Sequence, residues 1–165
     1  MKKIYAVSHN KFIREIQRLG ITNDNVKEHN TAFIQIGNTD LEECEFMPFT
    51  LNNNDNVLSL RFDDCDEVFN TPIIGSLRYV PQYPMSEEQA EIIFNFIENN
   101  KDKATFLVHC KAGQSRSGGV IKFISEYFEI PYNLILRDNP MIYPNHRIVS
   151  LLRQIKERKD GERTL

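Results

Sequence analysis

The 165-residue chain has few cysteines, no excess of positive charge and no long run of apolar residues. Its three cysteines are widely spaced and form neither a disulfide framework nor a zinc-binding pattern, which favours a reducing compartment. The formal net charge of -3 provides no overall positive field that would attract nucleic acid or an anionic membrane. No apolar run approaches the roughly 20 residues of a membrane-spanning helix, and the one near the N-terminus is too short for a signal peptide. We therefore expect a cytoplasmic protein without nucleic-acid or integral membrane contacts, and we expect it to be a monomer.

Hydrophobic and charged residues make up 41% and 26% of the chain, ordinary values for a soluble globular protein. The length fits one domain with a substantial core, so we expect a single domain over residues 1–165. The predicted strands cover 4–7, 32–36, 57–62 and 105–108, with a short edge piece at 46–49, and the predicted helices begin near Ser8 or Asn10, at Ser86, at Val120, at Tyr132 and near Pro144. This alternation predicts an α/β domain whose mostly parallel central sheet is flanked by helices on both faces. We expect residues 160–165 to be a frayed tail.

One stretch, residues 109–119 (HCKAGQSRSGG), connects the apolar strand at 105–108 to the helical pattern at 120–128. Backbone N–H groups point outward at a helix N-terminus, where the helix dipole is also positive, and both features favour a bound anion. Arg116 adds a planar guanidinium that can contact two phosphate oxygens at once. Cys110 lies at the mouth of this turn, where the thiolate form of a cysteine is favoured. The stretch therefore predicts an anion site with a nucleophile beside it.

The spacing from His109–Cys110 to Arg116–Ser117, with five residues between them, resembles the active-site signature of the protein tyrosine phosphatase superfamily. Gly113 also fits the fuller form of this signature, in which a glycine lies midway and a serine or threonine follows the arginine. The resemblance implies the compact, dual-specificity-phosphatase-like version of that fold. It also implies hydrolysis of phosphomonoesters through a phosphocysteine intermediate, without a metal or other cofactor.

The resemblance implies a role for each residue of the stretch. Cys110 would be the nucleophile, and the Ser117 hydroxyl would help to expel the thiolate in the second step, unless Ser117 only caps the helix. His109 would be an orienting residue whose side chain points away from the pocket. The Arg116 guanidinium and the backbone amides of the loop would bind the phosphate oxygens. The residues of this phosphate-binding loop are Lys111, Ala112, Gly113, Gln114, Ser115 and Arg116.

A general acid is expected after the strand at 57–62, because the leaving oxygen needs a proton. Residues 62–64 (FDD) resemble the acid loop of the family, in which an aromatic residue ends a strand and an acidic residue soon follows. In similar phosphatases the acid is the second residue after that aromatic, which favours Asp64. Asp63 and Asp66 stay open as alternatives, and so does a simple hydrated acidic turn.

Two further features lie outside the signature. Segment 65–85 is longer than in compact family members and contains several prolines, and we expect a long loop there. It forms either a flap beside the pocket, in which Arg78, Tyr79 or Tyr83 shapes substrate choice, or a partly ordered surface excursion. Asn145 resembles a residue that supports the pocket in relatives, or it is only a helix cap.

The function that these residues favour is hydrolysis of phosphotyrosine in proteins, with phosphoserine and phosphothreonine as additional substrates. A phosphoinositide or inositol phosphate phosphatase is the first alternative, because residues 109–113 match the loop start of lipid phosphatases in the superfamily. Those relatives carry another lysine where this chain has Gln114, so the predicted pocket is less basic. A non-catalytic phosphate-binding module is the second alternative, although such a module would not need Cys110 as a nucleophile. The expected partner is therefore a phosphorylated protein or a phosphoinositide.

Overall fold

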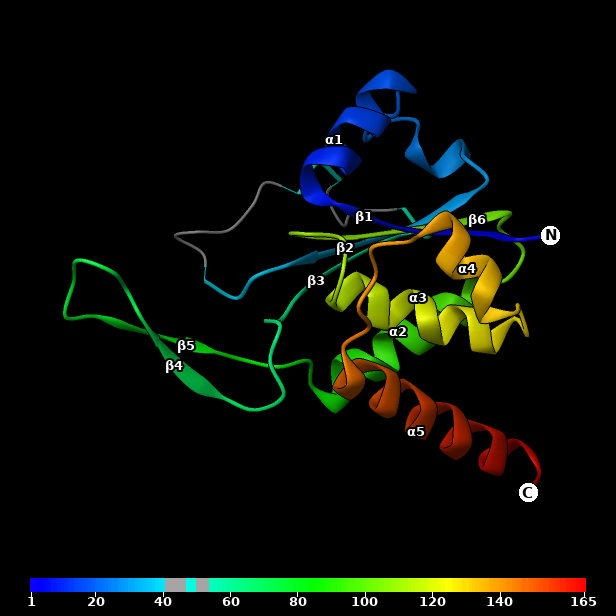
Figure 1. Cartoon of the computed structure of the whole chain (residues 1–165). Helices are drawn as coiled ribbons and strands as arrows, with labels where there is room; N and C mark the ends of the chain where they lie inside the picture. The colour runs from blue at the N-terminus through cyan, green and yellow to red at the C-terminus, as the bar shows by residue number, and fades with distance from the viewer. Residues whose placement is uncertain (41–46, 50–53) are drawn as a thin grey trace.

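The computed structural model of the chain describes residues 1–40, 47–49 and 54–165. Its centre is a four-stranded parallel sheet (Figure 1). Across this sheet the strands lie in the order β1 (Lys3–Ser8), β6 (Thr105–Cys110), β2 (Thr31–Gly37) and β3 (Val57–Arg61). A separate antiparallel hairpin consists of β4 (Phe69–Pro72) and β5 (Tyr79–Gln82), and Figure 1 shows it projecting from the body of the molecule.

Helices cover both faces of the parallel sheet (Figure 1). One face carries α1 (His9–Arg18), and the opposite face carries α2 (Glu87–Asn99), α3 (Arg116–Tyr127), α4 (Tyr132–Asp138) and α5 (His146–Arg163). A short 3-10 helix, Val26–Glu28, precedes β2. This arrangement confirms the predicted α/β class with a parallel central sheet between two helical layers. Among the described helices, none is both long enough and apolar enough to cross a membrane.

Two apolar cores follow from the alternation of side chains along β2, which lies inside the sheet. Ala32, Ile34 and Ile36 are buried in the larger core, which α2, α3 and α5 also line. Phe33 is buried in the smaller core together with Phe12 of α1. Burial on both faces is expected of an inner strand of a parallel sheet, and it explains the nearly continuous apolar run in this part of the sequence.

Side-chain caps set the start of two helices. Ser8 Oγ accepts a hydrogen bond from the backbone N–H of Lys11 at 3.2 Å, so Ser8, and not Asn10, caps α1. Ser86, the predicted start of α2, forms a capping box with Gln89. These two helix starts were predicted correctly because each cap involves only residues that are close together in the sequence.

The start of α3 differs from the prediction. The helix begins at Arg116, earlier than the predicted start at Val120. Gly118 and Gly119 lie in its first turns and contribute no apolar side chain, so the helical periodicity becomes visible only after them. A side chain at position 119 would come within about 3.0 Å of Ile148 in α5. The glycine therefore permits the close packing of α3 on α5.

The C-terminal residues are more ordered than predicted. α5 continues to Arg163, whose guanidinium pairs with Glu98 of α2. A frayed tail from residue 160 is therefore wrong, because the last turn is held against the neighbouring helix. The edge piece predicted at 46–49 includes a residue outside the described part of the chain, and its described portion forms no strand.

Segment 65–85 contains the β4–β5 hairpin instead of a long loop. Its turn is closed by hydrogen bonds from the backbone N–H of Ile73 to the carbonyl of Arg78 (3.0 Å) and from the N–H of Ser76 to the carbonyl of Ile73 (3.1 Å). Gly75, with a φ of 80°, supplies the left-handed conformation of this turn. Both strands are largely exposed, so their side chains lack the apolar alternation by which a strand is recognised.

Candidate active site

The loop at 111–116 starts where β6 ends, at the carboxyl edge of the sheet. Cys110 is the last residue of β6 and pairs with Ser8 at the end of β1. Gly113 has a φ of 72°, and a side chain at this position would overlap the backbone of Val7 and Ser8. The glycine of the signature is therefore required by the close approach of the loop to β1.

The backbone carbonyls of the loop, and not its amides, hold the loop in place. The Lys111 carbonyl accepts a hydrogen bond from the His9 N–H at 3.2 Å. The Gln114 carbonyl accepts one from the Tyr143 N–H at 3.0 Å. Within the described residues, none of the backbone N–H groups of 111–116 donates a hydrogen bond to the protein. The loop therefore keeps its donors available for an anion, as in other main-chain anion nests.

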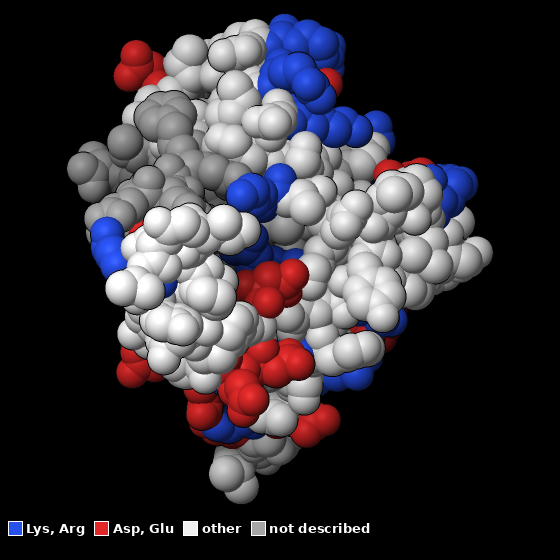
Figure 2. All heavy atoms as spheres, turned by 60° about the vertical axis from the view of Figure 1, so that its left-hand side comes forward, with Lys and Arg blue, Asp and Glu red and all other residues white. Residues whose placement is uncertain are grey.

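The remaining loop side chains lie at different depths. Lys111 and Ala112 are exposed, whereas Gln114 and Ser115 are half-buried. Figure 2 looks onto this end of the molecule and shows a hollow with basic side chains inside it and acidic side chains along one side. The positive charge is therefore concentrated within the hollow, while its margin is partly negative.

The thiol of Cys110 lies at the base of the loop and is 2% exposed. Its Sγ is 3.2 Å from Oγ of Ser117. Ser117 is fully buried in the first turn of α3, whereas Ser115 occupies the N-cap position of that helix. The alternative that Ser117 caps the helix is therefore wrong. Its hydroxyl can instead donate a hydrogen bond to the sulfur, which would stabilise a thiolate there.

Arg116 is the first residue of α3, and its side chain is buried. Its Nη1 donates hydrogen bonds to Oδ1 of Asn38 (2.7 Å) and to the carbonyl of Phe62 (2.9 Å). No acceptor for Nε or Nη2 occurs among the described residues. One guanidinium nitrogen is thus fixed by the protein, and the other two can contact two oxygens of a bound anion.

Asn38 was not among the predicted site residues. It directly follows β2, which pairs with β6 in the sheet. The sequence predicted only a strand ending at residue 36, although parallel strands bring their carboxyl ends to the same edge of a sheet. The contact of Asn38 with Arg116 joins positions 78 residues apart in the sequence. Only knowledge of the strand order could have revealed it.

The carboxylate of Asp64 is hydrogen-bonded to the loop at 111–116. Its Oδ1 accepts hydrogen bonds from Ser115 Oγ at 2.7 Å and from Asn145 Nδ2 at 2.9 Å. Its Oδ2 has no hydrogen-bond partner among the described residues. Asn145 also caps α5, because its Oδ1 accepts from the Ile148 N–H at 3.1 Å. Asn145 is therefore a helix cap that also contacts Asp64, and its support of the pocket stays a prediction.

Asp63 points away from the loop and is 3% exposed. Its carboxylate accepts hydrogen bonds from the backbone N–H and hydroxyl of Thr39 and from the backbone N–H of Tyr83. These bonds connect the end of β2 to the base of the hairpin, which is a structural role. Asp66 is exposed, and its backbone carbonyl accepts a hydrogen bond from Arg147 at 3.2 Å. Of the three acidic residues, Asp64 is thus the one whose carboxylate is bonded to the loop.

The side chain of His109 lies on the α1 face of the sheet, away from the thiol of Cys110. Its ring centroid is 4.3 Å from that of Phe12 and 5.4 Å from that of His9. Burial lowers the pKa of His109 to about 3, with smaller lowering from the charges of His9 and Arg116. His109 is therefore neutral at neutral pH and serves the site by packing beneath the loop.

The lowered pKa of His109 predicts an acid-sensitive fold. Below pH 6.5 this ring binds a proton in the unfolded chain, whereas in the folded chain it stays neutral down to about pH 3. The free energy of unfolding should therefore fall as the pH drops through this window, by up to about 1.4 kcal/mol per pH unit. His109→Phe should reduce this slope in urea unfolding between pH 7 and 4, whereas replacement of the exposed His146 by glutamine should leave it unchanged. Equal slopes for His109→Phe and the wild type would contradict the assignment.

No protein-family model and no curated protein sequence matches the chain. Among solved structures, the crystal structure of human DUSP28 matches with a TM-score of 0.49 and 13% sequence identity, covering 96% of this chain and 94% of that chain. The structure of PTPMT1 in complex with PI(5)P matches with a TM-score of 0.48 and 17% identity, covering 87% of each chain. The structure of Tk-PTP in the active form matches with a TM-score of 0.40 and 20% identity, covering 82% of this chain and 84% of that chain. The chain resembles these structures in its backbone fold, at sequence identities of 20% or less.

Proposed function

We propose that this chain is a cysteine-dependent phosphatase of the dual-specificity-phosphatase-like kind. In this proposal it hydrolyses phosphotyrosine in proteins, with phosphoserine and phosphothreonine as further substrates. The observation that carries the proposal is the set of unused donors around Cys110. The backbone N–H groups of 111–116 and two nitrogens of Arg116 have no acceptor among the described residues, and they surround the base of one loop. A phosphoryl dianion satisfies such donors better than any neutral ligand.

The first step of the proposed reaction forms a phosphocysteine. The thiolate of Cys110 attacks phosphorus, so that an S–P bond forms while the P–O bond to the leaving group breaks. Arg116 and the loop amides hold the three non-bridging oxygens throughout. Asp64 is suited to protonate the leaving oxygen, because Oδ1 is anchored to the loop and Oδ2 is unengaged within the described residues.

The second step returns the enzyme to its starting state. A water molecule attacks the phosphorus of the phosphocysteine and transfers a proton to Asp64, while the S–P bond breaks and inorganic phosphate leaves. The departing sulfur carries a negative charge, which a hydrogen bond from Ser117 at 3.2 Å would stabilise. Atoms and protons therefore balance over the two steps with groups supplied by the chain, the substrate and water.

Two observations favour a phosphorylated protein over a phosphoinositide as the substrate. The loop has a half-buried Gln114 where a second basic side chain would bind additional phosphates. Asp66 is exposed and lies two residues beyond Asp64, whose carboxylate is bonded to the loop, so its negative charge would repel a headgroup with several phosphates. A pure binding module is disfavoured as well, because it would need neither a buried nucleophile nor a carboxylate held over the loop.

A panel of phosphate esters tests the proposed function. Phosphotyrosine peptides, phosphothreonine peptides, phosphoinositides and inositol phosphates are compared for phosphate release, with the Cys110→Ser protein as the blank. We expect the highest kcat/KM on phosphotyrosine peptides and a covalent phosphoenzyme after rapid acid quenching of a labelled substrate. Binding of phosphate by the folded protein without turnover of any ester would instead support a binding module.

Asp64→Asn is expected to lower kcat by about 10²–10⁴-fold on a peptide phosphotyrosine, because the leaving oxygen no longer receives a proton. The amide oxygen of the asparagine can still accept the hydrogen bonds from Ser115 and Asn145, so the loop should keep its conformation. The loss should be smaller for an aryl phosphate whose leaving group is stable as an anion. Asp66→Asn, at an exposed acidic residue of the same loop, is the matched control and should retain activity. Equal losses in the two variants would count against Asp64 as the acid.

A further inference from the structure

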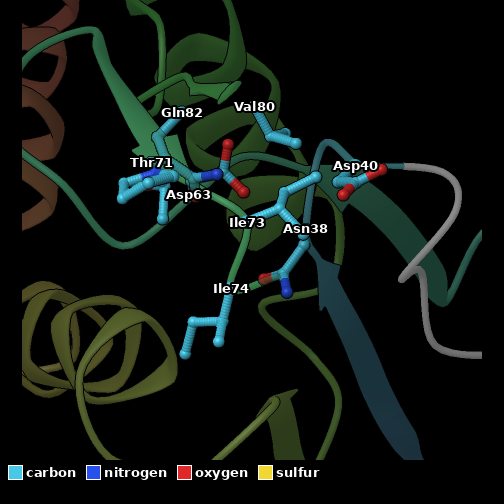
Figure 3. Close-up of a pocket in the computed structure, with 9 residues that line it drawn as sticks. Asn38, Asp40, Asp63, Thr71, Ile73, Ile74, Val80 and Gln82 are labelled. Atoms are coloured by element: carbon cyan, nitrogen blue, oxygen red, sulfur yellow. The ribbon is translucent and has the colours of Figure 1, made fainter. Parts of the chain in front are cut away.

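A cavity of about 440 Å³ lies between the β4–β5 hairpin and the carboxyl end of β2 (Figure 3). Asn38 and Asp40 line it from the β2 side, and Ile73, Ile74 and Val80 line it from the hairpin. The chemistry proposed for the phosphate ester uses none of the hairpin residues. The cavity is therefore available to a part of the substrate other than the phosphate.

The cavity and the phosphate-binding loop share their boundary. Asn38 lines the cavity and also accepts the hydrogen bond from Nη1 of Arg116 at 2.7 Å. Asp63 lines the cavity too, and the next residue, Asp64, is bonded to the loop through Ser115. A substrate whose phosphate contacts Arg116 therefore has its neighbouring groups beside this cavity.

The cavity is lined by both polar and apolar side chains. Ile73 and Val80 supply half-buried aliphatic side chains, Ile74 lies at the exposed rim, and Asp40 supplies a carboxylate beside the polar Thr71 and Gln82. The acidic residues that line the cavity are Asp40 and Asp63, and three more, Asp64, Asp66 and Glu67, precede the hairpin in the sequence. Figure 2 shows acidic side chains next to the hollow and largely uncharged surface in front of them. This combination favours a ligand that has an apolar side chain with a positive charge nearby, and it repels a polyanion.

The hairpin is poorly suited to bind a peptide by adding a strand. Each of its two strands contains a proline, Pro72 in β4 and Pro81 in β5, and proline has no N–H to donate. Prolines on exposed strand edges hinder pairing with another chain. Recognition at the hairpin should therefore depend on side chains that enter the cavity.

We propose that this cavity is the subsite for an apolar side chain next to the phosphorylated residue of a polypeptide substrate, with a basic residue of that polypeptide near Asp40. The β4–β5 hairpin is then the element that selects substrates. This inference rests on the proposed phosphatase function and names its substrate class. A subsite with an aliphatic wall discriminates by about 10-fold or more in kcat/KM between an apolar side chain that fills it and one that does not.

Matched phosphotyrosine peptides test the subsite. A single leucine is moved through the three positions on each side of the phosphotyrosine, and each peptide is compared with its serine counterpart. We expect one position at which leucine raises kcat/KM by about 10-fold, and this ratio should fall to near one in Val80→Asp. Leu77→Asp alters a residue at the hairpin tip that is 99% exposed and does not line the cavity, so the ratio should persist. No preference at any position, or equal loss in both variants, would overturn the proposal.

A charge reversal covers the case in which Val80→Asp disturbs the hairpin. Wild-type enzyme should prefer peptides with a lysine near the phosphotyrosine over those with a glutamate, and Asp40→Lys should reverse that preference. A disordered hairpin would only weaken the preference, so a reversal identifies Asp40 as the contact. Unchanged charge preference in Asp40→Lys would refute the predicted role of this residue.

Two further measurements distinguish the proposed subsite from a failure of the phosphatase function and from membrane docking. Turnover of an aryl phosphate by the wild-type enzyme, absent in Cys110→Ser, tests the proposed function alone, because this substrate has no flanking residue. Vesicles containing phosphoinositides test a lipid surface as the partner of the exposed tip residue Leu77. Faster turnover on vesicles than on every peptide, lost in Leu77→Asp and kept in Val80→Asp, would overturn the polypeptide subsite in favour of membrane docking.

Discussion

Cys110→Ser is expected to lower kcat on the order of 10⁴–10⁶-fold while inorganic phosphate still binds. The serine hydroxyl is close to the thiol in size but is a far weaker nucleophile, because it does not ionise at neutral pH. The backbone N–H groups of 111–116 and the Arg116 guanidinium are unaffected, so the anion site persists without a group that attacks phosphorus. Turnover of an aryl phosphate and calorimetric titration with inorganic phosphate measure the two quantities separately.

Cys65→Ser is the matched control for the nucleophile. Burial, followed by the charges of Asp63, Asp64 and Asp66, raises the pKa of the Cys65 thiol, so this sulfur is a poor thiolate at neutral pH. The variant should keep nearly full activity. Retained turnover in Cys110→Ser, or loss of activity in Cys65→Ser at unchanged stability, would refute the assignment of the nucleophile.

Arg116→Lys is expected to lower kcat by about 10³–10⁵-fold, the range found for arginines that stabilise phosphoryl transfer. A lysine keeps the positive charge but cannot donate two parallel hydrogen bonds to the anion. The guanidinium donates to Asn38 and to the Phe62 carbonyl through Nη1 alone, at 2.7 and 2.9 Å, and keeps two further nitrogens for the anion, whereas the single lysine nitrogen would have to serve all of these acceptors. The loss should appear mainly in kcat, because the charge around phosphorus is redistributed in the transition state.

Arg137→Lys provides the control for the arginine. Arg137 is exposed and pairs only with the adjacent Asp138 among the described residues, so its replacement should leave kcat unchanged. Asn38→Ala should produce a smaller loss than Arg116→Lys, because the guanidinium keeps its bond to Phe62. Comparable activity of Arg116→Lys and Arg137→Lys would contradict the role of Arg116. Urea unfolding at neutral pH checks that the variants are folded.

Much of the site could be predicted because its main parts are local in the sequence. The strand that carries Cys110, the turn that follows it and the helix that begins at Arg116 occupy one short stretch, and their order determines that backbone donors and a guanidinium meet near the sulfur. The face of the sheet on which the His109 side chain lies follows from the alternation of side chains along the strand. Neither inference requires knowledge of how distant segments pack.

The parts that could not be predicted depend on tertiary contacts. Asp63 and Asp64 are adjacent and chemically alike, yet Thr39 and Tyr83 bind one while Ser115 and Asn145 bind the other. Only the packing of the β2 end, the hairpin base and the start of α5 distinguishes them. The hairpin was missed for a different reason, because its exposed strands bury no apolar face against a core.

The strand order β1-β6-β2-β3 has a consequence for biosynthesis. β1 is synthesised first, but its only partner among the described strands is β6, with Lys3 opposite Thr105. β6 also joins β1 to the β2–β3 pair, so a nascent chain lacks a continuous sheet until this strand has left the ribosome. Because β6 ends at Cys110, the step that completes the sheet is also the step that encloses this thiol. A ribosome-bound fragment ending before β6 therefore contains neither the finished sheet nor Cys110.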